Sequence, residues 1–184
     1  DLIKRFFYKD KTFTTKSINT NIDENFRLIA KEYINKIKDL SSKSEKITDK
    51  LPINFKWIGF IKLILPDAKV VHCIRNPKDT CISIYKNYFT STELNYAYSF
   101  DELINFYNNY RDLMKFWEKN LPGFITEIVY EDLIHNPKEE ISNLINKCDL
   151  SWNENCLKFY NNTRRIRTAS DTQVRNKLYK SFIF

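Results

Sequence analysis

The sequence predicts an α/β fold in which a parallel sheet is flanked by helices. Two short runs rich in β-branched residues, 69–74 and 125–130, are the strand candidates. Segments of ten or more residues with helical spacing of apolar side chains lie between and around them, and this alternation is typical of parallel sheets. Two strands are fewer than a stable sheet normally has, so we expect further strands in unrecognised segments or outside this sequence.

The helices are predicted from apolar periodicity together with start and stop signals. Asp23 is the expected N-cap of the first helix, in which apolar residues recur at helical spacing as far as Leu40. Pro66 ends the helix before the first strand, and Pro77 suits the first position of the helix after it. The expected helices cover residues 23–40, 54–65, 77–89, 99–120, 136–148 and 153–160, with a single turn at 131–133 and loops at 1–20 and 161–181.

The chain is basic, with a formal net charge of +7 and a dense cationic run near its end. This charge is compatible with nucleic acid, an acidic surface or a phosphorylated small molecule as the partner, and also with a solvated basic surface that binds nothing. The sequence contains no run of about 18 apolar residues and no signal-peptide pattern at its start, so we expect no transmembrane helix and a cytoplasmic location.

Four cysteines, at positions 73, 81, 148 and 156, form no Cys-x-x-Cys pair, and the two histidines are not spaced as metal ligands relative to them. Each cysteine lies among apolar residues, which is typical of small buried side chains. We therefore expect neither a metal site nor a structural disulfide, in keeping with a reducing compartment.

Residues 69–85 combine a strand, a tight turn and the start of a helix. Arg75 follows the apolar run of the strand, Asn76 and Pro77 break it, and Ser83 lies two turns into the helix. Ligands of open α/β sheets bind at the carboxyl ends of strands, and helix N-termini attract phosphate through their unpaired N–H groups. The segment is therefore predicted to hold an anion.

The nine residues from Arg75 to Ser83 resemble the 3′-phosphate-binding segment of sulfotransferases that use 3′-phosphoadenosine-5′-phosphosulfate (PAPS). In that family an Arg at the strand end and a Ser eight residues later both contact the 3′-phosphate. A residue at the helix start and one about two turns on share a face of the helix. Arg also offers a permanently charged fork that can bind a phosphate through two hydrogen bonds.

Other segments resemble the bacterial and tyrosylprotein-type branch of the same family, in the same order along the chain. The resemblance implies that Lys50 approaches the transferring sulfuryl group as a catalytic residue. It also implies that Tyr130, Ser170 and Arg175 join Arg75 and Ser83 in binding the cofactor. The matching segments are residues 48–55, 65–69, 130–137 and 168–175.

The family fold resembles that of P-loop kinases, and its first strand leads into a Gly-rich loop that grips the 5′-phosphosulfate. The chain has only two glycines, Gly59 and Gly123, and no such loop. The tyrosylprotein-type branch places its proposed base, a Glu, soon after that loop, and no residue here corresponds to it. We therefore expect residues 1–184 to form a single partial sulfotransferase domain, incomplete at both ends.

The resemblance implies that the parent protein transfers a sulfuryl group from PAPS to an acceptor hydroxyl or amine, without a metal, and releases 3′,5′-adenosine diphosphate. The acceptor would be a small molecule, a glycan or a protein, and no nucleic acid partner is expected. A P-loop small-molecule kinase is one alternative, although it should carry Gly-x4-Gly-Lys-Ser/Thr. A basic module that binds RNA or another polyanion without catalysis is the other.

Each candidate residue also has a plain structural interpretation. Arg75 could be a surface Arg paired with Asp79, Ser83 a small packing residue, and Lys50 a solvated loop residue. Tyr130 could belong to the core. His72 alternates with the apolar residues of its strand, so a hydrogen-bonded histidine in the core or at its rim is favoured over a catalytic base.

Overall fold

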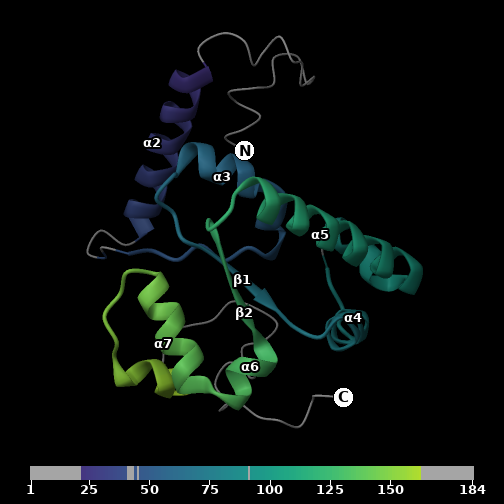
Figure 1. Cartoon of the computed structure of the whole chain (residues 1–184). Helices are drawn as coiled ribbons and strands as arrows, with labels where there is room; N and C mark the ends of the chain where they lie inside the picture. The colour runs from purple at the N-terminus through teal and green to yellow at the C-terminus, as the bar shows by residue number, and fades with distance from the viewer. Residues whose placement is uncertain (1–21, 41–43, 45, 91, 163–184) are drawn as a thin grey trace. The chain divides into compact units, whose positions relative to one another are not determined.

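The computed structural model describes residues 22–40, 44, 46–90 and 92–162 (Figure 1). The chain divides into two compact units, Asp1–Ala68 and Lys69–Phe184. Among the described residues, the first unit is helical and the second contains a small parallel sheet with helices. The mixed α/β class is therefore confirmed, whereas one partial domain over residues 1–184 stays a prediction.

The first unit is built around helices α2 (Ile22–Leu40) and α3 (Ile58–Ile64). Ile29 on α2 and Ile58 on α3 are almost completely buried. The predicted first helix is confirmed, but Asp23 is not its N-cap, because the helix begins at Ile22 and Asp23 lies in the first turn. Burial of Ile29 shows that the apolar stripe of α2 contributes to the core of this unit.

Side-chain contacts join α2 to the segments that follow it. The rings of Phe26 and Phe60 meet edge to face, with centroids 5.8 Å apart. The hydroxyl of Tyr33 donates a hydrogen bond to Asp49 Oδ2 at 2.8 Å. Burial, reinforced by this hydrogen bond and by the charge of Asp49, raises the pKa of Tyr33 to about 12.

The single helix predicted over 54–65 is wrong in its first half. A 3₁₀-helix, η2 (Pro52–Trp57), comes first and α3 follows. The backbone of Trp57, at φ −116° and ψ 9°, leaves the helical region and divides the two elements. Apolar periodicity cannot separate them, because a 3₁₀ turn and an α turn bring nearly the same residues to one face.

The second unit contains the sheet, in which β1 (Val70–Ile74) pairs in parallel with β2 (Ile125–Val129). Both strands agree with the sequence prediction. Val70 lies opposite Ile125 and Ile74 lies opposite Val129, so the two strands begin and end level with each other. The residues that follow them therefore emerge together at the carboxyl edge of the sheet.

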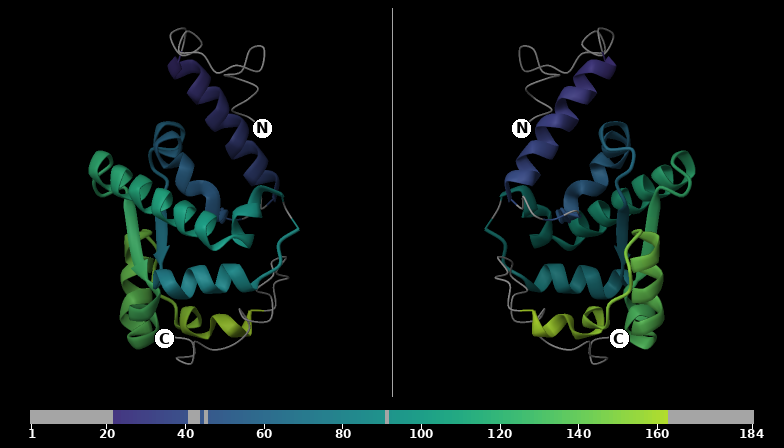
Figure 2. Two further views of the ribbon diagram at one scale, coloured as in Figure 1. Left: turned by 90° about the vertical axis from the view of Figure 1, so that its right-hand side faces the viewer. Right: turned by 90° about the vertical axis from the view of Figure 1, so that its left-hand side faces the viewer.

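Helices cover both sides of this strand pair. In Figures 1 and 2, α4 and α5 lie on one side of the strands and α7 lies on the other. Leu103 and Met114 on α5, Ile128 on β2 and Ile134 on α6 are buried and form the core. The helical elements of this unit are α4 (Pro77–Lys86), η3 (Thr92–Tyr98), α5 (Phe100–Asn120), α6 (Tyr130–His135), α7 (Pro137–Lys147) and η4 (Glu154–Asn161).

Several boundaries differ from the prediction. Helix α4 ends three residues earlier than expected, where Asn87 takes an extended conformation at φ −96° and ψ 141°. Element η3 was not predicted, and the single turn expected at 131–133 is the six-residue helix α6. The helix expected at 153–160 is the 3₁₀ element η4, which is broken at Lys158.

The four cysteines are free thiols, and none of them is fully buried. Cys73 is exposed, so its interpretation as a buried side chain is wrong. It lies on the same face of β1 as Val71, which is 37% exposed, and successive strand residues alternate between faces. Among the described residues, no helix is long and apolar enough to cross a membrane.

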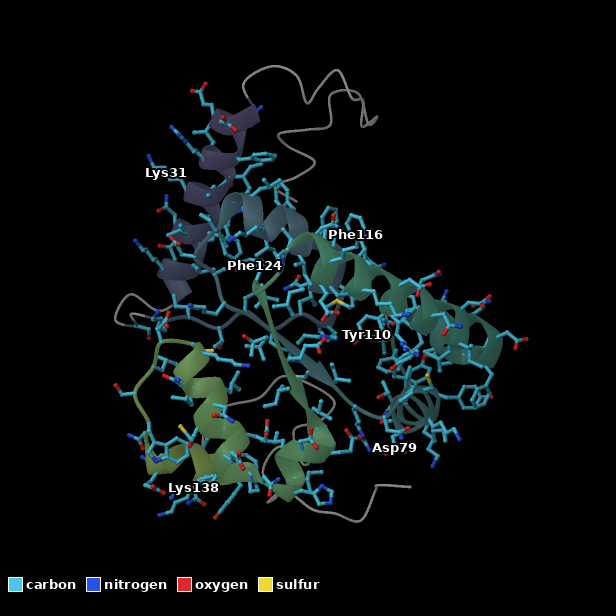
Figure 3. The ribbon with its side chains drawn as sticks, viewed as in Figure 1. Lys31, Asp79, Tyr110, Phe116, Phe124 and Lys138 are labelled. Carbon is cyan, nitrogen blue, oxygen red and sulfur yellow. The ribbon has the colours of Figure 1, made fainter. Side chains whose placement is uncertain are left out.

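His72, Glu127 and Tyr110 form a hydrogen-bonded cluster that joins β1, β2 and α5. His72 lies directly opposite Glu127 in the strand register, and its Nδ1 is 3.0 Å from Glu127 Oε1. Its Nε2 is hydrogen-bonded to the hydroxyl of Tyr110, which Figure 3 labels on α5. His72 is thus a hydrogen-bonded histidine at the rim of the core, as predicted.

Burial raises the pKa of Tyr110 to about 12, and nearby Tyr107 and Glu127 act in the same direction. A tyrosine whose pKa is higher in the folded state stabilises the fold fully below its unfolded value of about 10. Above that pH the unfolded state releases the proton first. The contribution of Tyr110 is therefore lost as the pH rises from about 10 to 12.

We predict that Tyr110→Phe removes this alkaline loss of stability. At pH 8 the variant should be less stable by about 1 kcal/mol, because the hydrogen bond to His72 is gone. Between pH 10 and 12 its free energy of unfolding should fall less than that of the unsubstituted chain. Urea unfolding at pH 8, 10 and 11.5 measures this, with Tyr88→Phe as a control at an exposed tyrosine. Equal falls for Tyr110→Phe and the unsubstituted chain would contradict the prediction.

Candidate anion-binding site

Arg75 and Tyr130 are brought together by the strand register. They are the first residues after β1 and β2, and Ile74 and Val129 before them are paired. The guanidinium carbon Cζ of Arg75 lies 5.0 Å from the centroid of the Tyr130 ring, a cation–π contact. Two of the predicted cofactor-binding residues therefore touch each other, although they are far apart in the sequence.

The carboxylate of Asp79 is the counter-charge of Arg75. Arg75 Nη2 lies 3.4 Å from Asp79 Oδ2, and the Arg75 side chain is 33% exposed while that of Asp79 is 3% exposed. Asp79 Oδ1 is also buried and has no hydrogen-bond partner among the described residues. Arg75 therefore reaches the surface, and the carboxylate lies behind it at the start of α4, where Figure 3 labels Asp79.

The turn between β1 and α4 is fixed by Asn76. Its side-chain Oδ1 accepts hydrogen bonds from the backbone N–H groups of Lys78 at 2.9 Å and Asp79 at 3.4 Å. Its own N–H donates to Glu131 Oε1 on α6 at 2.9 Å. The Glu131 carboxylate therefore ties the turn to the neighbouring helix.

The sequence suggested that N–H groups at the N-terminus of α4 bind an anion, but these groups are hydrogen-bonded within the protein. Pro77 has no N–H, and those of Lys78 and Asp79 bond to the Asn76 side chain. The next N–H, of Thr80, bonds to the Asn76 carbonyl at 3.0 Å. An anion near this turn must therefore be held by side chains, with Arg75 as the cation that the geometry offers.

The other predicted site residues lie in different parts of the chain. Ser83 is exposed on α4, and its hydroxyl has no hydrogen-bond partner among the described residues. Lys50 is exposed and belongs to the first compact unit, so its role stays a prediction. Ser170 and Arg175 lie outside the described residues.

Sequence reasoning named Asp79 only as a surface partner of Arg75. The spacing of four residues between them was the available signal, since it is the spacing at which charged side chains commonly pair near a helix start. Burial of Asp79 could not be read from the pattern, because a carboxylate in the first turn of a helix is ordinarily solvated.

The strand pair, the cation at its carboxyl edge and the flanking helices define an α/β protein with a candidate anion site. The comparisons with known proteins give the family. Residues 8–154 match the family model described as the sulfotransferase family. The match covers most of the chain, and the protein therefore belongs to the sulfotransferase family.

The chain is similar to two curated relatives. The chain is 36% identical over 156 residues, 84% of its length, to a protein of Aquifex aeolicus (strain VF5) named "Uncharacterized protein". It is 28% identical over 120 residues, 64% of its length, to a Caenorhabditis elegans protein named "Putative protein-tyrosine sulfotransferase". The matched part covers 20% of the first relative and 45% of the second, so the chain corresponds to less than half of either.

We predict that Asn76→Ala lowers the free energy of unfolding by about 1 kcal/mol, because two backbone donors of α4 lose their cap. Asn76→Ser should retain most of the stability, since its hydroxyl can also cap a helix. Urea unfolding of the three chains at pH 7 measures the difference. Equal stability of the Ala variant and the unsubstituted chain would show that the cap contributes nothing.

Proposed function

We propose that the protein containing this chain transfers a sulfuryl group from PAPS to an acceptor hydroxyl or amine. Membership of the sulfotransferase family supports sulfuryl transfer in general. The observation that carries the proposal is Arg75, a partly exposed cation at the carboxyl end of β1, held by Tyr130 and Asp79. The comparisons give no support to a P-loop small-molecule kinase or to a non-catalytic polyanion-binding module.

The residues around Arg75 fit a phosphate group. The guanidinium is permanently charged, its planar fork can donate two parallel hydrogen bonds, and a third of the side chain is accessible. In the proposal Arg75 and Ser83 hold the 3′-phosphate of PAPS, and Tyr130 restrains the guanidinium through its ring. Ser170 and Arg175 are proposed as further cofactor contacts on the strength of the resemblance. A P-loop-kinase-like arrangement of the complete sheet is part of the same proposal.

Bound PAPS supplies the sulfuryl group and an adenosine 3′-phosphate by which it can be recognised. Transfer of such a group resembles phosphoryl transfer, in which charge spreads over the transferred group and the leaving oxygen. The protein then contributes by positioning the reactants and by placing cations. Lys50 is proposed to stabilise the charge on the leaving oxygen, and Arg75 acts at the other end of the cofactor.

The acceptor class is also a proposal. A small molecule, a glycan and a protein each offer a hydroxyl or an amine. The printed name of the Caenorhabditis elegans relative refers to protein tyrosine, and this makes a tyrosine-containing peptide the first acceptor to test.

We predict that immobilised 3′,5′-adenosine diphosphate retains the full-length protein and that Arg75→Ala loses retention. Loss of charge-assisted hydrogen bonds of roughly 1.5–3 kcal/mol corresponds to an affinity about 10- to 150-fold lower. Ser83→Ala should weaken binding less, because a neutral hydroxyl contributes about 1 kcal/mol. Lys86→Ala, which removes the same charge from the far end of α4, is the matched control. Equal retention of Arg75→Ala and the unsubstituted protein would remove the proposed phosphate site.

We predict that Lys50→Ala lowers kcat for sulfuryl transfer by about 10²- to 10³-fold, as removal of a transition-state donor does in other enzymes. Affinity for 3′,5′-adenosine diphosphate should also fall, because the leaving oxygen that Lys50 stabilises stays on its 5′-phosphate. Initial rates with PAPS and a tyrosine-containing peptide measure kcat, and Lys46→Ala is a control at another exposed lysine of the same segment. An unchanged kcat would remove Lys50 from the mechanism.

A further inference from the structure

Among the described residues, Asp79 is the one polar residue that is buried, with 5% of its surface exposed. Nothing in the proposed reaction requires a carboxylate here, and a negative charge close to a phosphate site should weaken phosphate binding. Burying an ionised side chain is also costly unless it is paired. We therefore expect Asp79 to have a favourable effect that is larger than the cost to phosphate binding and the cost of burial together.

The contacts of Arg75 indicate that role. One side of the guanidinium meets the ring of Tyr130, with 5.0 Å between Cζ and the ring centroid, and Nη2 points toward Asp79 Oδ2 at 3.4 Å. An unrestrained Arg side chain samples many rotamers, and a ligand that binds it must overcome the loss of this conformational entropy. Two contacts from different elements fix the orientation of the guanidinium before the ligand arrives.

The two side chains of the Arg75–Asp79 ion pair differ in exposure, and the cation is the one that an incoming anion can reach. The Arg75 side chain is 33% exposed, whereas the Asp79 side chain is 3% exposed. An anion can thus reach the guanidinium without displacing the carboxylate. The carboxylate is fixed as well, because it sits in the first turn of α4, whose N-terminus is capped by Asn76.

We propose that Asp79 is a positioning residue that orients Arg75 for the 3′-phosphate of the cofactor. The inference rests on the proposed function, since it takes the 3′-phosphate as the ligand of Arg75. Asp79 acts through Arg75 and does not touch the ligand. Its removal weakens recognition of the 3′-phosphate and leaves recognition of the rest of the nucleotide unchanged.

The test compares two ligands that differ only in the 3′-phosphate. Isothermal titration of the full-length protein with 3′,5′-adenosine diphosphate and with adenosine 5′-monophosphate gives the two dissociation constants. Asp79→Ala should weaken binding of the diphosphate by about 10-fold, the size of one charge-assisted hydrogen bond, and change binding of the monophosphate less than twofold. Asp79→Asn keeps an acceptor oxygen of the same shape and should lose less than Asp79→Ala.

Three outcomes would overturn the inference. Equal weakening of both ligands would make Asp79 a general structural residue, and tighter binding of the diphosphate would make it a repulsive neighbour of the phosphate. Unchanged diphosphate binding in Asp79→Ala, with Arg75→Ala still defective, would remove Asp79 and leave the proposed function intact. If Arg75→Ala itself binds the diphosphate normally, the proposed phosphate site fails, and that result is distinct from the others.

A stability measurement tests the pairing without any ligand. Arg75→Ala leaves the Asp79 carboxylate buried without its counter-charge, so the melting temperature should fall. Adding Asp79→Asn to Arg75→Ala should raise the melting temperature again, because the uncompensated charge is removed. A further fall in the double variant would contradict the pairing of Asp79 with Arg75.

Discussion

The candidate site depends on the parallel pairing of β1 with β2. Their backbone hydrogen bonds fix a register in which Ile74 lies opposite Val129, and this register alone makes Arg75 and Tyr130 neighbours. A slip of one residue would turn every side chain of a strand to the other face of the sheet. The same register places His72 opposite Glu127 and so allows Tyr110 to join α5 to both strands. The sheet thus holds the site and its supporting helix together.

The second constraint is electrostatic. The phosphate-binding residue of the proposal is one half of an ion pair whose other half is buried, and the helix start beside it has no N–H group to offer. In the proposal the anion is recognised by side chains, and one of them, the Arg75 guanidinium, is oriented by a ring and a carboxylate. Such a site would differ from a helix N-terminus that binds phosphate through several backbone donors, because its specificity would depend on the direction of side chains.

Much of the fold followed from local pattern. Both strands, α2, α5 and α7 were predicted within one or two residues of their observed bounds, since each has a clear period and a recognisable start. The elements that were missed or given the wrong type are short, since η2, η3, α6 and η4 are each eight residues or fewer, and α4 was predicted three residues too long. Segments of this length have too few turns for a period to be visible, and their conformation is set by the elements they connect. The contact between Asn76 and Glu131 was not predicted either, because it joins the turn before α4 to the short helix α6.

The sequence by itself determined the residue types of the site. Local sequence shows the order of a strand, then Arg75, Asn76 and Pro77, then a helix, and it also shows the position of Ser83 further along that helix. Only the tertiary structure decided that Tyr130 stacks on Arg75 and that Glu131 holds the turn after β1. It also decided that Asp79 is a buried counter-charge. The physical reason is that the contacts of Arg75 with Tyr130 and of Asn76 with Glu131 join residues more than fifty positions apart, which meet only when the parallel strands pair.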